Sequence, residues 1–557
     1  MTVKSTMPIG VTDFKELREN YYLVDKTDFI RQFIDGRSAA TLITRPRRFG
    51  KTLFMSMMDW FFSIDKKEAS KHLFDGLTID RAGEKYMAQR GSRPVISFSL
   101  KGIEGSTWTT ARNIFCRRIR ELYKKYYYLW ENSDLKDDDK TYAQNIVNLK
   151  GEPEDYLDSL KDLSRMLFEY HGIKPVMLID EYDAPLQYAY DNGYYDEAVT
   201  FFRTCYNYAF KDNEYLDFAI ITGVLRVAKE SIFSGLNSLD VCSVTTDKYT
   251  EACGFTPAEV ESMANELGFA DKLPEIKEWY DGYHFSQSDI YNPWSVINYV
   301  DKKFTPQPYW INTSSNGILE KLLSHADKER FDELDGLIKG EPICTVLNEG
   351  IMYESIGRNA EDLYNMLLTS GYLTIEKNSG QLDRRPVDMI IPNKEICMVY
   401  ADEILRSLMP TSGVGLSLMM LEYMLRGNAE KFESSLKKTV EQIASTFDTA
   451  KDKQEIFYHG LMLGFTATLH GNGYQVKSEG EAGYGRFDVA IFPLDNKNPG
   501  VILEFKVADD EKSLEKAAED AKNQINDKGY IAEFDSRGVR NVWKYGIAFC
   551  GKNVLMR

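Results

Sequence analysis

The chain has 557 residues, of which 43% are hydrophobic and 27% are charged, and this composition predicts roughly two to four globular domains. No apolar run reaches the length of a membrane span, the first residues lack the apolar segment of a signal peptide, and no cysteines form a C-x-x-C pair, so a cytoplasmic protein without membrane contact is expected. The net charge of −17 argues against a nucleic-acid-binding surface over the whole chain, because phosphates are contacted by Lys and Arg.

Four successive domains are predicted along the chain: an α/β unit, an aromatic-rich helical lid, a winged-helix-like and helical region, and a second α/β unit. Their predicted bounds are 1–240, 241–330, 331–450 and 451–557. In the first unit, short apolar runs alternate with helical patterns, which is typical of a buried parallel sheet. The runs are 41–44, 94–100, 175–180 and 216–222.

The first apolar run leads into a basic loop that ends in Gly50-Lys51-Thr52 and precedes a helical pattern. In this order, backbone N–H groups and a lysine bind the phosphates of a nucleotide, and a hydroxyl binds Mg²⁺. The loop residues predicted to bind ATP are Arg47, Arg48, Phe49, Gly50, Lys51 and Thr52, with Thr52 also a metal ligand.

One position of this loop departs from the usual pattern G-x-x-x-x-G-K-[ST], because Arg45 stands where the first glycine is expected. We expect Arg45 to fold outward, since a loop without this glycine needs only a small change of shape. No acidic residue lies between Asp35 and Asp59, so a locally positive site for a small anion is predicted.

Two later apolar runs end in polar side chains. The run at 175–180 ends in Asp180-Glu181, and carboxyl ends of parallel strands are where open α/β sheets place ligands. Asp180 is predicted to hold Mg²⁺, and Glu181 to orient and deprotonate the attacking water. The run at 216–222 ends in Thr222, predicted to sense the γ-phosphate, and Arg226 would neutralise charge that develops on it.

The C-terminal unit carries a second set of acidic residues. Residues 486–492 and 501–507 predict two paired strands, with Asp488 on the first and Glu504 and Lys506 on one face of the second. Two converging carboxylates bind Mg²⁺ or Mn²⁺, and a neighbouring lysine activates water for attack on a phosphodiester. The alternative is a salt bridge at the end of the strands.

Three further residues are predicted to approach the same point. Glu455 lies on the preceding helical pattern, Gln524 lies on the following helix at 513–526, and Tyr530 comes after it. Glu455 and Gln524 are included with Asp488, Glu504 and Lys506 as candidate catalytic residues.

Motifs along nearly the whole chain resemble those of prokaryotic proteins that join an AAA-ATPase-like domain to a PD-(D/E)XK nuclease-superfamily domain. The motifs are 22–27, 45–52, 178–183, 222–226, 231–237, 291–294, 485–488 and 504–506. In that family the loop Arg-Pro-Arg-Arg-Phe-Gly-Lys is the usual form. The resemblance implies an N-terminal P-loop NTPase sheet, a central helical and winged-helix region, and a C-terminal restriction-endonuclease-like α/β domain.

Two main functions remain open from the sequence, and a third interpretation makes the aromatic-rich and winged-helix regions the recognition module, with both sites supporting it. The first is an ATPase coupled to a metal-dependent nuclease that acts on DNA or RNA. The second is an ATP-dependent regulatory switch in which an inactive nuclease fold docks a partner, and the acidic net charge favours it. Self-association is a further expected interaction, because a neighbouring subunit can donate an arginine to an ATPase site.

Overall fold

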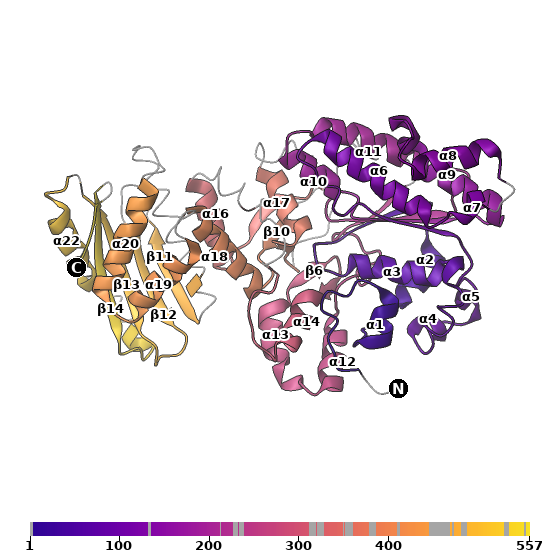
Figure 1. The fold of residues 1–557 in the computed structure, drawn as a ribbon. Coiled ribbons are helices and arrows are strands. Elements are labelled where there is room, and N and C mark those ends of the chain that lie inside the picture. Colours follow the sequence, from indigo (N-terminus) through magenta and orange to yellow (C-terminus); the bar gives the residue numbers. More distant parts are fainter. Residues whose placement is uncertain are drawn as a thin grey trace. The chain divides into compact units, whose positions relative to one another are not determined.

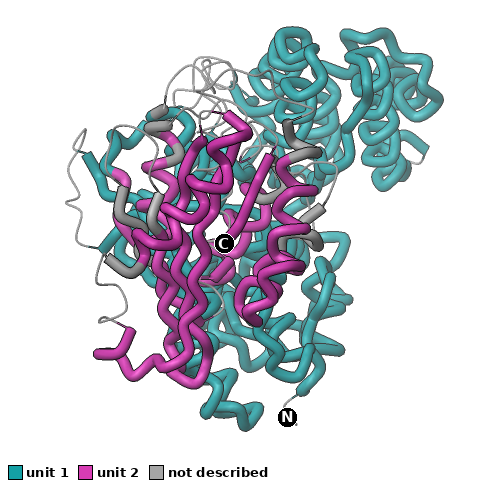
Figure 2. Tube along the Cα trace, turned by 90° about the vertical axis from the view of Figure 1, so that its left-hand side faces the viewer, with its two compact units in different colours: residues 1–310, 344–393 teal, residues 311–343, 394–557 magenta. Residues whose placement is uncertain are grey.

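The computed structural model describes most of the chain. The described residues are 4–131, 135–211, 213–226, 232, 239–310, 319, 328–348, 350, 360–377, 386–408, 413–444, 468–469, 473–480, 487–508, 510–527, 534–550 and 553–557. Two compact units are distinguished (Figure 2), one of residues 1–310 and 344–393 and the other of residues 311–343 and 394–557. The four domain bounds expected from the sequence stay predictions.

A parallel five-stranded sheet forms the centre of the first unit, in the order β2-β3-β4-β1-β5. The strands are β1 (Ala40–Thr44), β2 (Val95–Ser99), β3 (Val176–Asp180), β4 (Phe218–Gly223) and β5 (Leu239–Cys242). The four apolar runs are thus confirmed as strands β1 to β4. The sequence did not reveal β5, because this short, half-buried strand contains Asp240 and has no apolar run.

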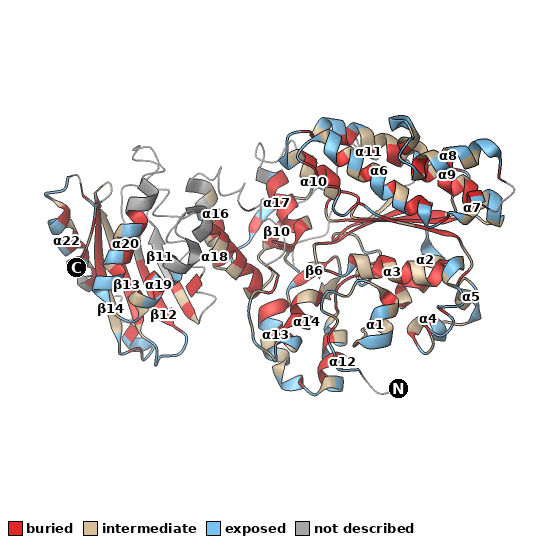
Figure 3. Ribbon diagram, in the orientation of Figure 1, coloured by how far each residue is buried: buried red, intermediate tan, exposed pale blue. Residues whose placement is uncertain are grey.

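Helices cover both faces of this sheet (Figure 1), and its strands are buried between them (Figure 3). One layer contains α1 (Phe14–Asn20), α2 (Asp28–Gly36), α3 (Lys51–Phe62), the short 3-10 helix η1 (Ile64–Lys66), α4 (Thr78–Arg81) and α5 (Glu84–Met87). The other contains α6 (Trp108–Lys124), α7 (Tyr128–Glu131), α8 (Asp137–Val147), α9 (Pro153–His171), α10 (Ala184–Asp191) and α11 (Tyr195–Phe210). No helix in the described parts of the chain is both long and apolar enough to cross a membrane.

The strand order determines which side chains meet at the carboxyl edge of the sheet. Because β4 pairs with β1 on one side and with β3 on the other, the end of β4 lies between the other two strand ends. Thr222 near the end of β4 is therefore placed between Asp180, the last residue of β3, and Thr52, which lies in the first turn of α3 after the loop that follows β1.

The aromatic-rich segment after β5 contains three helices and a hairpin. Its elements are α12 (Pro257–Leu267), the 3-10 helix η2 (Ala270–Lys272), α13 (Leu273–Tyr280), β6 (Tyr283–Phe285), β7 (Ser288–Ile290) and α14 (Pro293–Asp301). The expected aromatic residues are buried, including Tyr280, Tyr283 and Trp310.

The region predicted to be winged-helix-like contains the order helix–strand–strand–helix, formed by α17 (Ala360–Ser370), β9 (Thr374–Ile375), β10 (Pro386–Ile390) and α18 (Lys394–Leu408). β8 (Ile343–Val346) extends the β9–β10 pair to a three-stranded sheet, and α16 (Lys328–Ile338) precedes it. The helical segment that follows contains α19 (Gly413–Leu425) and α20 (Ala429–Ala444).

The C-terminal sheet has the order β11-β12-β13-β14-β15, with one parallel pair, β13 and β14, among antiparallel ones. Its strands are β11 (Tyr474–Gly480), β12 (Phe487–Pro493), β13 (Gly500–Val507), β14 (Val542–Cys550) and β15 (Asn553–Met556). Helix α22 (Leu514–Asp527) covers one face, where Ile525 packs against Ile502. On the opposite face, the Tyr545 hydroxyl donates to the Met424 carbonyl of α19 at 3.0 Å.

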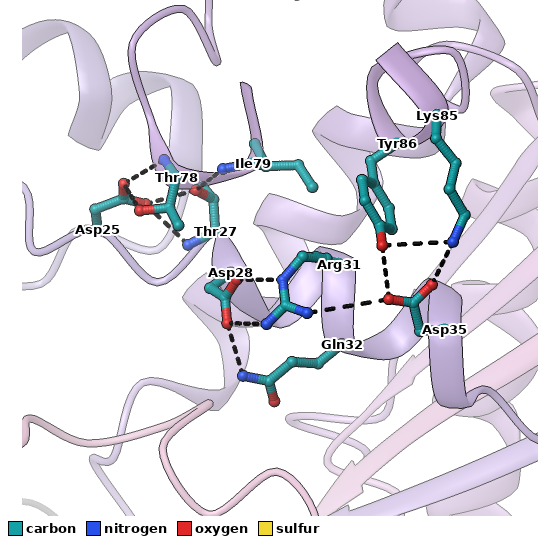
Figure 4. A network of polar contacts seen from close by, with 10 residues as sticks. All are labelled: Asp25, Thr27, Asp28, Arg31, Gln32, Asp35, Thr78, Ile79, Lys85 and Tyr86. Carbon is teal, nitrogen blue, oxygen red and sulfur yellow. Dashed lines mark hydrogen bonds and ion pairs between the residues drawn. The ribbon is translucent and has the colours of Figure 1, made fainter. Parts of the chain in front are cut away.

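A polar network ties the N-terminal segment to the helices around it (Figure 4). The Asp25 carboxylate accepts hydrogen bonds from the backbone N–H and hydroxyl groups of both Thr27 and Thr78, at 2.6 to 2.9 Å. The next residue, Lys26, pairs with Glu259 of α12 at 2.6 Å. The segment 22–27 therefore connects the first helical layer to α12.

We predict that Asp25→Ala lowers the free energy of unfolding by about 3 kcal/mol, because four donors lose a charged acceptor at once. Urea denaturation measures this loss. Asp28→Ala, which removes an ion pair that is more than a third exposed, should cost less than about 1 kcal/mol. Equal losses for the two variants would contradict the anchoring role of Asp25.

Candidate nucleotide site and C-terminal carboxylates

The loop between β1 and α3 is wrapped around the ammonium group of Lys51. Gly50 precedes α3 with φ 89°, a left-handed conformation that favours glycine. Lys51 Nζ donates to the carbonyls of Arg45 at 2.9 Å and Pro46 at 2.8 Å. Burial lowers the pKa of Lys51, and the nearby carboxylates of Asp183 and Asp180 oppose this shift. The loop thus holds a desolvated cation at the helix N-terminus, a setting that attracts anions.

Asp180, at the end of β3, is hydrogen-bonded to α3 and to β4 through its two carboxylate oxygens. Oδ2 accepts from the Thr52 hydroxyl at 2.8 Å, and Oδ1 accepts from the Thr222 hydroxyl at 2.5 Å. Asp180 is buried and Thr222 is completely so. Hydroxyl and carboxylate oxygens are the ligands that Mg²⁺ prefers, so the donor set of Thr52 and Asp180 fits this ion.

Glu181 follows Asp180 in a left-handed conformation, with φ 54°. This conformation is uncommon for a residue other than glycine and is often found at functional sites. Burial raises the pKa of Glu181, and the neighbouring charge of Asp180 raises it further. The Lys101 ammonium lies 4.0 Å from the Glu181 carboxylate. A carboxylate with a raised pKa is a suitable proton acceptor for water.

Asp183 and Tyr182 hold the turn that follows β4, and the sequence did not identify their roles. Asp183 Oδ2 accepts from the backbone N–H groups of Val224 at 3.0 Å and Leu225 at 2.8 Å, and the Tyr182 hydroxyl donates to the Leu225 carbonyl at 2.7 Å. Arg226 follows this turn directly and is half-buried. The signal in the sequence is Asp183 itself, a further acidic residue three positions after Asp180 within the family-like motif at 178–183.

The expectation for Arg45 is wrong, because its side chain points inward and is completely buried. Its guanidinium donates to the carbonyls of Thr44 at 2.8 Å, Cys242 at 2.9 Å and Tyr249 at 2.7 Å. It also lies 5.5 Å from the centre of the Phe285 ring. Three carbonyl acceptors and an aromatic face compensate for the lost hydration, so the arginine connects the loop to β5 and the segment after it.

Three further loop residues, Arg47, Arg48 and Phe49, contact the aromatic-rich segment or α10. Arg48 has φ 69°, and its guanidinium lies 4.0 Å from the Trp294 ring centre and donates to the Tyr309 carbonyl at 3.1 Å. Arg47 donates to Gln187 of α10 at 2.8 Å. Phe49 is buried and packs against Tyr283 at a centroid distance of 5.0 Å. Nucleotide contacts by these three residues stay predictions.

In the C-terminal sheet, β12 and β13 bring two of the candidate carboxylate positions together. Residues Asp488 and Glu504 lie directly opposite each other in the antiparallel register. Glu504 is 1% exposed, and its Oε1 has no hydrogen-bond partner among the described residues. An ionised oxygen that is buried without a partner is costly, and a divalent cation would satisfy it.

The surroundings of Glu504 are formed by the sheet and α22. Glu504 and Lys506 share the face of Ile502, which α22 covers, because side chains alternate along a strand. Gly546 is the parallel neighbour of Glu504, and its lack of a side chain lets α22 approach closely. Gln524 lies on α22 and is half-buried.

Part of the predicted C-terminal set lies outside what the structure describes. Glu455 and Tyr530 lie outside the described residues, and for Asp488 the structure describes the backbone position alone. Within the described residues, no group of three or more His, Cys, Asp or Glu side chains is arranged to hold a metal ion. A metal site at Asp488 and Glu504 therefore stays a prediction.

Two family models match the two ends of the chain. Residues 8–233 match a family model described as a predicted AAA-ATPase, and residues 453–557 match one described as the PD-(D/E)XK nuclease superfamily. The first range contains the loop at 45–52, Asp180 and Thr222, and the second contains Asp488 and Glu504.

A full-length relative has no described activity. The chain is 25% identical over 559 residues to an "uncharacterized protein in vnfD 5'region" of Azotobacter chroococcum mcd 1, covering 96% of this chain and 95% of the relative. The similarity to this relative therefore extends over nearly the whole of both chains. The chain combines an N-terminal domain of the predicted AAA-ATPase family with a C-terminal domain of the PD-(D/E)XK nuclease superfamily.

Proposed function

We propose that the protein binds and hydrolyses Mg²⁺-ATP in its N-terminal domain and that this activity controls metal-dependent cleavage of nucleic-acid phosphodiesters by its C-terminal domain. The observation that carries the first half is the convergence of Thr52, Asp180 and Thr222 through direct hydrogen bonds beside the buried Lys51. Three residues from separate elements, α3, β3 and β4, meet there, in an arrangement that serves the charge of a nucleotide better than it serves a hydrophobic core.

Each residue of the N-terminal site has a role in this proposal. Lys51 would leave the loop carbonyls for the phosphate oxygens of ATP, because a charged acceptor makes the stronger hydrogen bond. Thr52 and Asp180 would hold Mg²⁺, which neutralises phosphate charge when bound. Glu181 would accept the proton of the attacking water, and Thr222 with Arg226 would face the transferred phosphate.

The proposal for the C-terminal domain rests on the buried Oε1 of Glu504, which has no hydrogen-bond partner among the residues that the structure describes. Asp488 and Glu504 would together hold Mg²⁺ or Mn²⁺, which polarises a phosphodiester and lowers the pKa of a bound water. Lys506, on the same face as Glu504, would orient or activate the water. Gln524 on the covering helix and Glu455 would complete the site.

Removal of the loop lysine tests nucleotide binding. Lys51→Ala should weaken binding of fluorescent ATP by at least about 100-fold, because two charge-assisted hydrogen bonds are worth roughly 3 kcal/mol. Lys85→Ala, the matched control, removes the same charge from an exposed ion pair and should leave affinity unchanged. An affinity for Lys51→Ala within twofold of the wild type would exclude this loop as the binding site.

Glu181→Gln should separate binding from hydrolysis. We expect kcat to fall about 100-fold or more while ATP affinity is retained, because the amide cannot accept a proton. In the wild type, only the ionised carboxylate is active, so kcat should decrease as the pH falls through the raised pKa of Glu181. A wild-type rate in Glu181→Gln would assign the proton transfer to another group.

Glu504→Gln tests the metal site with two measurements. We expect loss of Mg²⁺- or Mn²⁺-dependent cleavage of a DNA and RNA panel and loss of the increase in Tm that the metal produces. In metal-free buffer the variant should be about 1 to 2 kcal/mol more stable, because it replaces a buried carboxylate whose Oε1 has no partner within the described part of the chain. Glu519→Gln, an exposed position on α22, is the control. Metal-dependent cleavage by Glu504→Gln would refute the assignment.

A second candidate function is an ATP-dependent switch in which the nuclease-like domain docks a partner without cleaving nucleic acid. The net charge of −17 favours it, because an acidic protein repels polyanions. Under this alternative, Lys51→Ala still abolishes ATP binding, but the wild-type protein cleaves nothing in the panel with any divalent metal.

A further inference from the structure

Helix α6 carries a basic surface that none of the proposed roles uses. Between positions 101 and 125 the sequence has seven Lys or Arg residues and two Asp or Glu residues, whereas the whole chain has 68 of the former and 85 of the latter. Such a local excess attracts anions even when the protein is acidic overall. The α6 basic face is defined here as Lys101, Arg112, Arg117, Arg118, Arg120 and Lys124.

Four of these six side chains face solvent, and three of the six have no carboxylate within ion-pair distance among the described residues. The buried side of α6 contains Phe115 and Ile119, while Arg117 and Lys124 are exposed. Glu121, the one acidic residue of α6, lies 2.7 Å from Arg120 and 3.1 Å from Lys124. Within the described part of the chain, Arg117 has no hydrogen bond or ion pair. A single carboxylate thus offsets only part of the positive charge of the helix.

The α6 basic face starts at the proposed hydrolysis site. Ser99, at the end of β2, is the register neighbour of Asp180, and Lys101 comes two residues later. The Lys101 ammonium lies 4.0 Å from Glu181, and the Arg118 guanidinium donates to the Lys101 carbonyl at 3.3 Å. An anion bound along α6 would therefore contact Arg118, which is hydrogen-bonded to Lys101, and Lys101 in turn lies beside Glu181.

We propose that the α6 basic face binds the phosphate backbone of a nucleic acid, an inference that rests on the proposed function. Four of its six cations are arginines, whose planar guanidinium groups form bidentate hydrogen bonds with phosphates. From Arg112 to Lys124 the helix spans roughly 18 Å, which equals the rise of about five phosphates along one strand of a duplex. Under the proposed function, the nuclease-superfamily domain would meet such a polyanion as its substrate.

The test compares two double variants that remove equal charge. Arg117→Gln/Lys124→Gln removes two exposed cations of the α6 basic face, and Lys71→Gln/Lys85→Gln removes two from the opposite helical layer. Binding of fluorescein-labelled single-stranded and duplex oligonucleotides is followed by anisotropy over a range of salt concentrations. We expect the first variant to bind about 50-fold more weakly at about 0.1 M salt. For the duplex, the slope of the logarithm of the binding constant against the logarithm of the salt concentration should be smaller in magnitude by about two. The control should bind within twofold of the wild type.

ATP hydrolysis provides a second measurement. Because Lys101 connects α6 to Glu181, the oligonucleotide should change kcat for ATP in the wild type and the control, but not in Arg117→Gln/Lys124→Gln. Equal oligonucleotide affinity and slope in both double variants would overturn the inference and leave the proposed function intact. A wild type that hydrolyses ATP but binds no oligonucleotide at low salt would overturn both the inference and the nucleic-acid part of the proposed function. Loss of self-association instead of oligonucleotide binding, seen by sedimentation, would assign α6 to a second copy of the chain.

Discussion

The N-terminal site depends on one shared carboxylate. Asp180 accepts the hydroxyl of Thr52 on one oxygen and that of Thr222 on the other, so three segments far apart in the sequence converge at a single side chain. This bridge requires β4 to lie between β1 and β3, which is the strand order of the sheet. A carboxylate this deeply buried needs such donors, because desolvation is costly for a charged group without partners.

Around this bridge, buried polar groups are matched to specific backbone partners. Arg45 satisfies carbonyls of β1, β5 and the segment after β5, and Asp183 satisfies two N–H groups after β4. Both are placed where a polar group would be expensive without a partner. Such contacts hold the loop at 45–52 and the turn before Arg226 in defined positions. Preorganised charge of this kind is the main means by which proteins stabilise phosphoryl transfer.

The two domains present their carboxylates in different electrostatic settings. Asp180 has two hydroxyl donors, so its charge is compensated without a ligand. Glu504 is equally buried, yet one of its oxygens has no donor among the described residues. The first arrangement is satisfied without a ligand, whereas the second would gain free energy if a cation bound, as proposed above.

The sequence alone determined the elements and the chemistry of the residues at their ends. Apolar runs predict β1 to β4. Residues at or beyond the ends of three of these strands, Gly50-Lys51-Thr52, Asp180-Glu181 and Thr222, are predicted to bind a ligand because open α/β sheets place ligands there. Alternation also predicted that Glu504 and Lys506 share a face. These features depend on local periodicity and residue type, which the sequence contains directly.

Only the tertiary structure decided how distant segments satisfy one another. The acceptors of Arg45 include carbonyls of Cys242 and Tyr249, about 200 residues later in the chain, and carbonyls carry no signature in a sequence. For the same reason the direction of Arg45 was mispredicted, since a local argument favours an exposed cation. Strand order and the approach of Lys101 to Glu181 likewise depend on the packing of whole elements. Local pattern specifies which groups are available, and the free energy of burying them together determines which of them meet.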